Sequence, residues 1–310
     1  MNSVKDEISK IIGINYDTVH EKINFKIINS VKEDGYTRQL VSFDSIDDMV
    51  SAYLLIPDVV DKNPAVLINH QHNGERHLGK SEVCGLAGNP LQAFGQTLAK
   101  KGFVVLAPDS ICFEDRRKNG HGIIPLSGDG DFLQHYNEMC YSILQGETLM
   151  KKVLSDAMNC ITLLSRLDFV DNKSIGTLGH SYGGNTVLFL SALDRRISFS
   201  CASGSACTYK NRILNNVGIE MASVIPGFIQ RYDIDDLVRC IAPRHLLIVS
   251  ADNDKYSADA DFIVEQARPS YEGHHAGSNL RHMKYSGGHA LTKERFDFIV
   301  EWVIKKGKKM

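Results

Sequence analysis

The central part of the chain alternates short apolar runs with segments of helical periodicity, and no other feature limits its fold as strongly. Residues 65–69 and 103–107 are nearly continuous apolar runs, as expected for strands that are covered on both faces. Segments with apolar residues at three- and four-residue spacing follow them, as in helices that pack against a sheet. This alternation predicts an α/β fold with a mostly parallel central sheet and helices on both of its faces.

Further elements on either side of this region complete the pattern. Two strand-like runs, residues 37–43 and 49–57, come first and can run antiparallel to the other strands. A helix is expected from Asn89, the N-cap, with Pro90 at its first position, to Gly102. More strands are expected over residues 174–178, 197–202, 245–249 and 280–285, and a closing helix carries Phe296, Ile299, Val300 and Val303 on one face.

The composition argues against several classes of partner. With a formal net charge of −2, the chain gives no reason to expect binding to nucleic acid or to an anionic membrane. No apolar stretch is long enough to cross a bilayer, and residues 1–10 lack the apolar core of a signal peptide. The seven cysteines are odd in number and form no CxxC pair, so no disulfide framework is expected. We therefore expect a cytoplasmic protein, monomeric or a homo-oligomer.

A short glycine-rich motif marks the expected nucleophile. Residues 179–183 read Gly-His-Ser-Tyr-Gly, which fits the pattern G-x-S-x-G, and they lie between the strand 174–178 and an apolar helix. In α/β-hydrolases this motif holds a nucleophilic serine on a sharp turn between strand and helix. The helix N-terminus behind it offers backbone N–H groups to a developing oxyanion. The motif therefore indicates Ser181 as a nucleophile.

A serine nucleophile needs a general base, and the sequence offers a histidine in a suitable place. In α/β-hydrolases this histidine follows the triad acid in the chain. His289 lies in a Ser-Gly-Gly-His loop, just past the last expected strand and before the closing helix. It is therefore the expected base. The other downstream histidines precede or lie within expected strands: His245, His274, His275 and His282.

Two aspartates compete for the acid of a catalytic triad. Asp252 and Asp254 both follow the strand 245–249, at the edge of the sheet where catalytic groups collect. Asp254 is favoured, because the sequence Asp-Lys-Tyr-Ser leads directly into the next helix. Asp252 is the alternative, and its side chain could instead hold the turn by hydrogen bonds to the backbone.

Two backbone N–H groups are expected to form the oxyanion hole. One belongs to Tyr182, directly after the serine, and the other to the loop His70-Gln71-His72, which follows the first buried strand. We expect His72 to donate, with Gln71 as the alternative. His70 and His72 also have the spacing of zinc ligands, but no third ligand is evident, so neither a metal nor a cofactor is expected.

Two longer segments resemble a known group of enzymes. Residues 98–109, Leu-Ala-Lys-Lys-Gly-Phe-Val-Val-Leu-Ala-Pro-Asp, resemble the LA-x-x-GY-x-V-x-x-PD segment of dienelactone-hydrolase-like and bacterial acetyl-xylan-esterase-like enzymes. Residues 169–176 resemble the VD-x-x-RIG run before their nucleophile, with Ser174 in place of the arginine. The similarity begins near residue 50 and implies an α/β-hydrolase fold that cleaves esters or lactones without a cofactor. Dienelactone hydrolases proper carry cysteine at the position of Ser181, so their substrate is not implied.

These observations predict a serine esterase that cleaves a small-molecule carboxylic ester through an acyl-enzyme intermediate. A peptidase related to prolyl oligopeptidases is one alternative, because it shares the order of the triad. Those enzymes generally add a large N-terminal propeller, whereas this chain has no internal repeats. A relative that only binds a small molecule is the second alternative, and an intact triad argues against it.

One domain is expected over residues 1–310, with an irregular segment at residues 207–235. This segment is too apolar for a solvated connection. It either completes the core or forms a cap whose apolar inner face, including Met221 and Phe228, receives the substrate. Charged residues of two other loops could contact a polar substrate or form solvated salt bridges: Glu75, Arg76, Lys80 and the run Glu114-Asp115-Arg116-Arg117.

Overall fold

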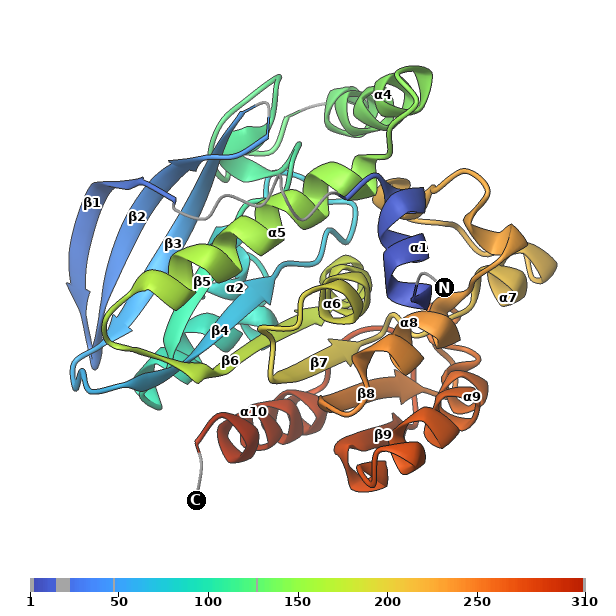
Figure 1. Ribbon diagram of the computed structural model, residues 1–310. Coiled ribbons are helices and arrows are strands. Elements are labelled where there is room, and N and C mark those ends of the chain that lie inside the picture. The colour runs from blue at the N-terminus through green and yellow to red at the C-terminus, as the bar shows by residue number, and fades with distance from the viewer. Residues whose placement is uncertain (1–2, 15–22, 47, 127, 309–310) are drawn as a thin grey trace.

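The computed structural model describes residues 3–14, 23–46, 48–126 and 128–308 (Figure 1). Within these residues one sheet of nine strands forms, in the order β1-β2-β3-β5-β4-β6-β7-β8-β9. The first three strands pair antiparallel, β3 pairs antiparallel with β5, and the strands from β5 to β9 are parallel to one another. The predicted α/β architecture is confirmed. The strands are β1 (Phe25–Glu33), β2 (Tyr36–Asp44), β3 (Met49–Pro57), β4 (Asn63–Asn69), β5 (Val104–Pro108), β6 (Val170–His180), β7 (Phe199–Ser203), β8 (His245–Ala251) and β9 (Leu280–Tyr285).

Helices cover both faces of the sheet and create two buried cores. Along β4, Ala65 and Leu67 belong to one core and Val66 and Ile68 to the other, as the two-residue period of a strand requires. The first core is completed by α1, α5, α6, α8 and α9, and the second by α3 and α10. The helices are α1 (Val4–Ile12), α2 (Lys80–Val83), α3 (Phe94–Lys100), α4 (Gly130–Leu144), α5 (Leu149–Arg166), α6 (Tyr182–Leu193), α7 (Tyr209–Leu214), α8 (Ile234–Ile241), α9 (Ala260–Gly273) and α10 (Lys293–Gly307).

The first helix, α1, packs far from the strands that follow it in sequence. It contacts α6 and α8, and its Ile8 and Ile12 are fully buried in the first core. The hydroxyl of Tyr232 donates a hydrogen bond of 2.6 Å to Glu7 on the same helix. The N-terminal helix is therefore attached to the second half of the chain.

The helix expected from Asn89 to Gly102 is divided in the structure. Residues Pro90–Gln92 form a 3₁₀ turn capped by Asn89, and α3 begins only at Phe94. Near its start α3 packs closely against the end of α2, because a Cβ on Gly95 would lie 2.7 Å from the carbonyl oxygen of Val83.

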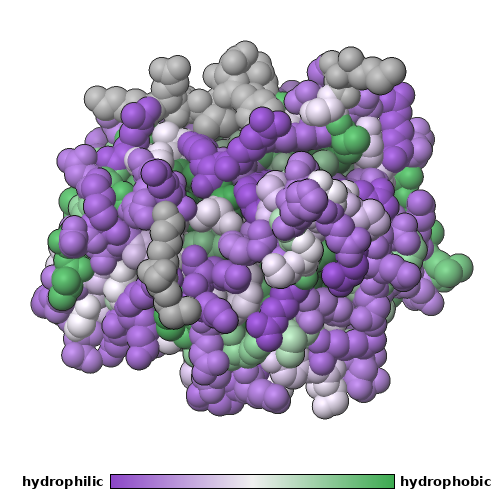
Figure 2. Space-filling model, turned by 60° about the horizontal axis from the view of Figure 1, so that its bottom comes forward, coloured by the Kyte–Doolittle hydropathy of each residue, from purple (hydrophilic) through white to green (hydrophobic). Residues whose placement is uncertain are grey.

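On the face of the molecule shown in Figure 2, hydrophilic residues make up most of the surface, and hydrophobic residues appear as small separate areas. Within the described ranges, none of the helices combines the length and the apolar character that a membrane span requires.

Candidate active site

Ser181 lies on a strained turn between β6 and α6. Its φ is +56°, a positive value that residues other than glycine rarely adopt. Its backbone N–H donates a hydrogen bond of 2.8 Å to the carbonyl of Ser203. A side chain would not fit at either of the glycines that flank this turn. A Cβ on Gly179 would collide with the backbone of Gly183, and a Cβ on Gly183 would collide with the carbonyl oxygen of Asn69. The turn therefore requires glycine at both positions.

The three residues expected to form a triad meet in one hydrogen-bonded chain. His289 Nε2 lies 2.8 Å from Ser181 Oγ, and His289 Nδ1 lies 3.0 Å from Asp254 Oδ1. They come from the turn after β6, the loop after β8 and the loop after β9, which all leave the same edge of the parallel sheet. The arrangement can deprotonate the serine hydroxyl and orient the imidazole.

The surroundings of Asp254 differ from those of Asp252. Asp254 is buried, and its carboxylate accepts hydrogen bonds from Ser257 Oγ at 2.7 Å and from the N–H of Tyr256 at 3.0 Å. Burial alone would raise the pKa of Asp254, but the hydrogen bonds from His289 and Ser257 hold it below its usual range. Asp252 is exposed, and its carboxylate accepts a hydrogen bond from the backbone N–H of Gly287 and none from the imidazole in the part of the chain that the structure describes. The geometry thus favours Asp254 as the partner of the histidine.

Arg295 holds the loop that carries His289, and the sequence analysis did not single it out. Its guanidinium is buried and donates to the carbonyls of Gly288 at 2.7 Å, Ala290 at 3.0 Å and Ser286 at 2.7 Å. These bonds fix the backbone on both sides of the histidine. No sequence signal distinguishes this arginine from a solvated residue in the first turn of a helix.

His180, which was also not identified from the sequence as a site residue, lies against the imidazole of His289. The rings of His180 and His289 have centroids 4.9 Å apart, and His180 Nδ1 lies 2.9 Å from Ser203 Oγ. Burial, with the neighbouring His289, lowers the pKa of His180 to about 3, so its ring stays neutral. Gly204 packs against both rings, with φ at +60°. His180 can therefore support His289 without adding charge.

Tyr182 and His72, the expected oxyanion donors, both line the pocket beside Ser181. The N–H of Tyr182 belongs to the first residue of α6. The His72 side chain is fixed, because Nδ1 accepts from the N–H of Gly74 at 2.9 Å and Nε2 lies 2.5 Å from Glu220 Oε2. The side-chain amide of Gln71 donates to Glu82 at 3.1 Å, a contact that leaves its backbone N–H, the alternative oxyanion donor, uninvolved.

The two histidines with zinc-like spacing do not converge on one point. His70 Nε2 accepts a hydrogen bond of 3.0 Å from the N–H of Ser110, whereas His72 Nε2 contacts Glu220. Burial lowers the pKa of His70 to about 4, so this ring is neutral and structural.

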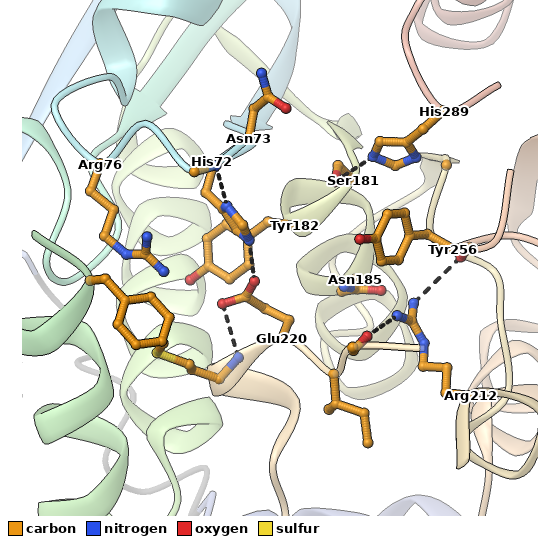
Figure 3. A pocket seen from close by; sticks show the side chains of 16 residues that line it. His72, Asn73, Arg76, Ser181, Tyr182, Asn185, Arg212, Glu220, Tyr256 and His289 are labelled. Atoms are coloured by element: carbon orange, nitrogen blue, oxygen red, sulfur yellow. Dashed lines mark hydrogen bonds and ion pairs between the residues drawn. The ribbon is translucent and has the colours of Figure 1, made fainter. Parts of the chain in front are cut away.

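The pocket above Ser181 has a volume of about 330 Å³ (Figure 3). Its walls come from the loop after β4, from α4, from the segment 207–235 and from the loops after β7, β8 and β9. Both apolar and polar side chains reach into it. The lining residues are His72, Asn73, Gly74, Arg76, Phe132, Ser181, Tyr182, Asn185, Gly204, Arg212, Gly218, Ile219, Glu220, Met221, Tyr256 and His289.

The segment 207–235 divides between the two roles considered for it. Residues 218–221, including Met221, line the pocket. Phe228 is 1% exposed, and its ring packs against Phe189 and Tyr209 with centroids 5.8 and 5.6 Å apart. Of the two roles left open, Phe228 therefore takes the core role and not the cap role, because its ring fills the core under α6.

Most of the charged loop residues form buried ion pairs and do not reach the pocket. Lys80 is fully buried, and its Nζ lies 2.6 Å from Asp109, 2.6 Å from Glu114 and 2.7 Å from Asp115. In the described part of the chain, these three carboxylates form the group close enough together to hold a metal ion, and the ammonium already contacts each of them. Of the charged loop residues named from the sequence, Arg76 is the one that lines the pocket.

Known proteins share the sequence pattern and the fold of this chain. A sequence model of the Abhydrolase family matches residues 2–287. A Bacillus subtilis (strain 168) protein named "Putative hydrolase YtaP" is 26% identical over 251 residues, covering 77% of this chain and 79% of that protein. The structure of a Bacteroides fragilis NCTC 9343 protein, described as a putative acetyl xylan esterase, has a TM-score of 0.75 at 16% identity, over 91% of this chain and 73% of that one. A glucuronoyl esterase from Solibacter usitatus has a TM-score of 0.66 at 16% identity, over 96% and 91%. The fold that the sequence resemblance implied is confirmed.

Proposed function

The chain belongs to the Abhydrolase family, and on this basis we propose that it is a serine hydrolase that cleaves a carboxylic ester of a small molecule. The observation that carries the proposal is the hydrogen-bonded chain Ser181–His289–Asp254 at the floor of a pocket. The names of similar proteins, a hydrolase and two esterases, agree with this reaction class.

The first half of the reaction acylates the serine. His289 Nε2 takes the proton of Ser181 Oγ as the oxygen attacks the ester carbonyl, and the negative charge moves to the carbonyl oxygen. The N–H groups of Tyr182 and His72 are the proposed donors to this oxyanion. When the tetrahedral intermediate collapses, the C–O bond to the alcohol breaks and His289 returns the proton to the leaving alkoxide.

Water completes the cycle on the same residues. His289 removes a proton from the water that attacks the acyl carbonyl, and the bond to Ser181 Oγ breaks as the serine regains its proton. Asp254 keeps the imidazole in one tautomer and stabilises its charged form. Because its pKa lies below the usual range, Asp254 stays ionised across the neutral range.

The dimensions of the pocket support a small substrate. A volume of about 330 Å³ is near the lower end for small-molecule sites. A peptidase of the prolyl-oligopeptidase type and a relative that only binds ligand remain the alternative functions. We also propose that residues 218–221, which line the pocket, act as a cap over the substrate. The cytoplasmic location and the possible homo-oligomer stay predictions from the sequence.

Covalent labelling and turnover together test the proposal. We expect a fluorophosphonate probe to label the protein, and 4-nitrophenyl acetate to give a burst of 4-nitrophenol. Ser181→Ala should abolish labelling and lower ester turnover by about four to six orders of magnitude while the melting temperature is kept. Ser165→Ala serves as control, because that hydroxyl donates to the carbonyl of Thr162 within its own helix and lies outside the pocket lining. A folded Ser181→Ala protein with most of its activity would contradict the assignment, and cleavage of prolyl peptides but not of esters would favour the peptidase.

A further inference from the structure

Arg76 is a buried cation in the wall of the pocket. It lies four residues after His72, in the loop after β4, and only 5% of its surface is exposed. Figure 3 shows its guanidinium directed into the pocket, on the side of Glu220 and opposite His289. The loop is rigid at this point, since the carbonyl of Arg76 accepts a hydrogen bond of 2.8 Å from the N–H of Glu114, a member of the buried Lys80 cluster.

Packing and one hydrogen bond aim the guanidinium but do not satisfy it. Arg76 Nε donates to His135 Nδ1 at 3.1 Å, and its Cζ lies 5.8 Å from the ring centre of Phe113 and 5.4 Å from that of Phe132. Burial lowers the pKa of His135 to about 4, so its ring is neutral: it accepts the hydrogen bond but carries no negative charge to balance the guanidinium. Among the described residues no carboxylate lies within 4.0 Å of Arg76, and both terminal nitrogens lack a hydrogen-bond partner.

The fold provides partners for its other buried arginines. Arg116 is paired with Asp48 and Asp156, and Arg117 with Asp131. The second arginine of the pocket, Arg212, donates to the carbonyls of Gly218 at 2.9 Å and Tyr256 at 3.4 Å. The terminal nitrogens of Arg76 are instead open to the pocket, where a ligand can supply the hydrogen-bond acceptors that they lack in the protein.

The acidic neighbour of Arg76 is already occupied. Glu220 Oε2 contacts His72 Nε2 at 2.5 Å, and Glu220 Oε1 accepts from the N–H of Met221 at 3.0 Å. Two arginines and a single carboxylate therefore line the pocket, which leaves an excess of positive charge beside Ser181. This balance favours a negatively charged ligand over a neutral one.

We propose that Arg76 binds a carboxylate of the substrate, so that the natural substrate is an ester that carries a second, free carboxylate in the same molecule. The planar guanidinium offers two parallel N–H donors, which fit a carboxylate in bidentate geometry. The bound carboxylate completes the hydrogen bonding of Arg76 and places the ester group over Ser181. This proposal rests on the proposed esterase function and names its substrate class.

Matched ester pairs test the proposal through a ratio of rates. Monomethyl adipate carries the charge in the acyl part, and 5-acetoxypentanoate carries it in the alcohol part. The neutral control for each is the compound in which the free carboxylate is a primary amide. We expect at least one charged ester to exceed its amide in kcat/KM by about tenfold or more, and Arg76→Gln to lower this ratio by about 10- to 100-fold. Arg76→Lys keeps the positive charge but loses the two parallel N–H donors, so it should give an intermediate ratio.

Control variants and a binding measurement separate the two proposals. Arg281→Gln removes one exposed positive charge on β9 and should leave the ratio unchanged. Adipate should bind Ser181→Ala, measured by calorimetry, and Arg76→Gln in that background should weaken the binding at least tenfold. No charge preference in either ester pair, or one that Arg212→Gln removes and Arg76→Gln does not, would overturn the role of Arg76. Adipate binding without hydrolysis of any ester would instead contradict the esterase function and leave the carboxylate site supported. Melting temperatures and fluorophosphonate labelling show that each variant with Ser181 is folded.

Discussion

The carboxylate of Asp252 accepts a hydrogen bond of 2.8 Å from the backbone N–H of Gly287, two residues before His289. The two competing aspartates therefore act on the same loop, Asp252 on its backbone and Asp254 on the imidazole. Asp254→Asn should allow the wrong tautomer of His289 and lower kcat about 10⁴-fold, as in the well-studied serine protease triad. Asp252→Asn should cost less than about tenfold, because an amide oxygen can still accept from Gly287. Steady-state kinetics of both variants measures this, and a reversed order would identify Asp252 as the acid.

Gly204→Ala tests whether the packing around His289 matters for catalysis. An added Cβ would lie 2.8 Å from His180 Cε1 and 3.1 Å from His289 Cε1, at a backbone φ of +60°. Displacement of the imidazole by a fraction of an ångström should lower kcat by about 10- to 100-fold, while the protein still folds. Gly146→Ala is the matched control, since that glycine also has a positive φ of +76° and a Cβ there meets nothing within 4 Å. Equal activities of the two variants would show that the ring stack is not needed.

Two apolar residues of the segment 207–235 should give opposite phenotypes. Met221 lines the pocket, so Met221→Ala should change KM or the preferred chain length of the ester, with a modest loss of stability. Phe228 is buried against Phe189 and Tyr209, so Phe228→Ala should cost about 3–5 kcal/mol of unfolding free energy and leave relative rates unchanged. Urea unfolding and an ester panel measure the two effects. A selectivity change in Phe228→Ala alone would place the substrate contact elsewhere.

Glu220 should make stability depend on pH in the acid range. Burial alone would raise the pKa of Glu220, but the hydrogen bond with His72 and the nearby positive charges hold it at about 2, below the ordinary value of 4.5. Its contribution to the free energy of unfolding is therefore complete above about pH 5 and is lost as pH falls toward 2. The stability difference between wild type and Glu220→Gln should shrink by about 1–2 kcal/mol between pH 6 and 3.5. Parallel pH profiles in urea unfolding would show that the carboxylate is not held in this way.

The fold and the meeting of Ser181, Asp254 and His289 could be predicted because their signals are local in the sequence. The central strands are apolar runs, and each of the three residues lies in the turn or loop that follows a strand, β6, β8 and β9 respectively. The edge strand β1 gave no such signal, since most of its residues are exposed and it pairs only with β2. Helix α4 also gives a weak signal, because it buries Gln134 and His135 while Phe132 and Leu144 are exposed.

The residues that support the site could not be predicted, because their roles depend on contacts between distant segments. Arg295 donates to three backbone carbonyls. Every residue has a backbone carbonyl, so the sequence does not show which carbonyls a side chain will meet. Arg76 and Lys80 look alike in the sequence as charges of one loop, yet one enters the pocket and the other is enclosed by carboxylates. The difference depends on Glu114 and Asp109, which are brought to Lys80 only by the folded chain.

The position of α1 has a consequence for synthesis on the ribosome. This helix leaves the exit tunnel long before α8, which begins only at Ile234 and forms part of the surface that buries Ile8 and Ile12. Until that late segment emerges, the nascent chain carries an undocked amphipathic helix whose apolar face is open to chaperones and to other chains. During synthesis α1 can therefore dock fully only after α8 has emerged.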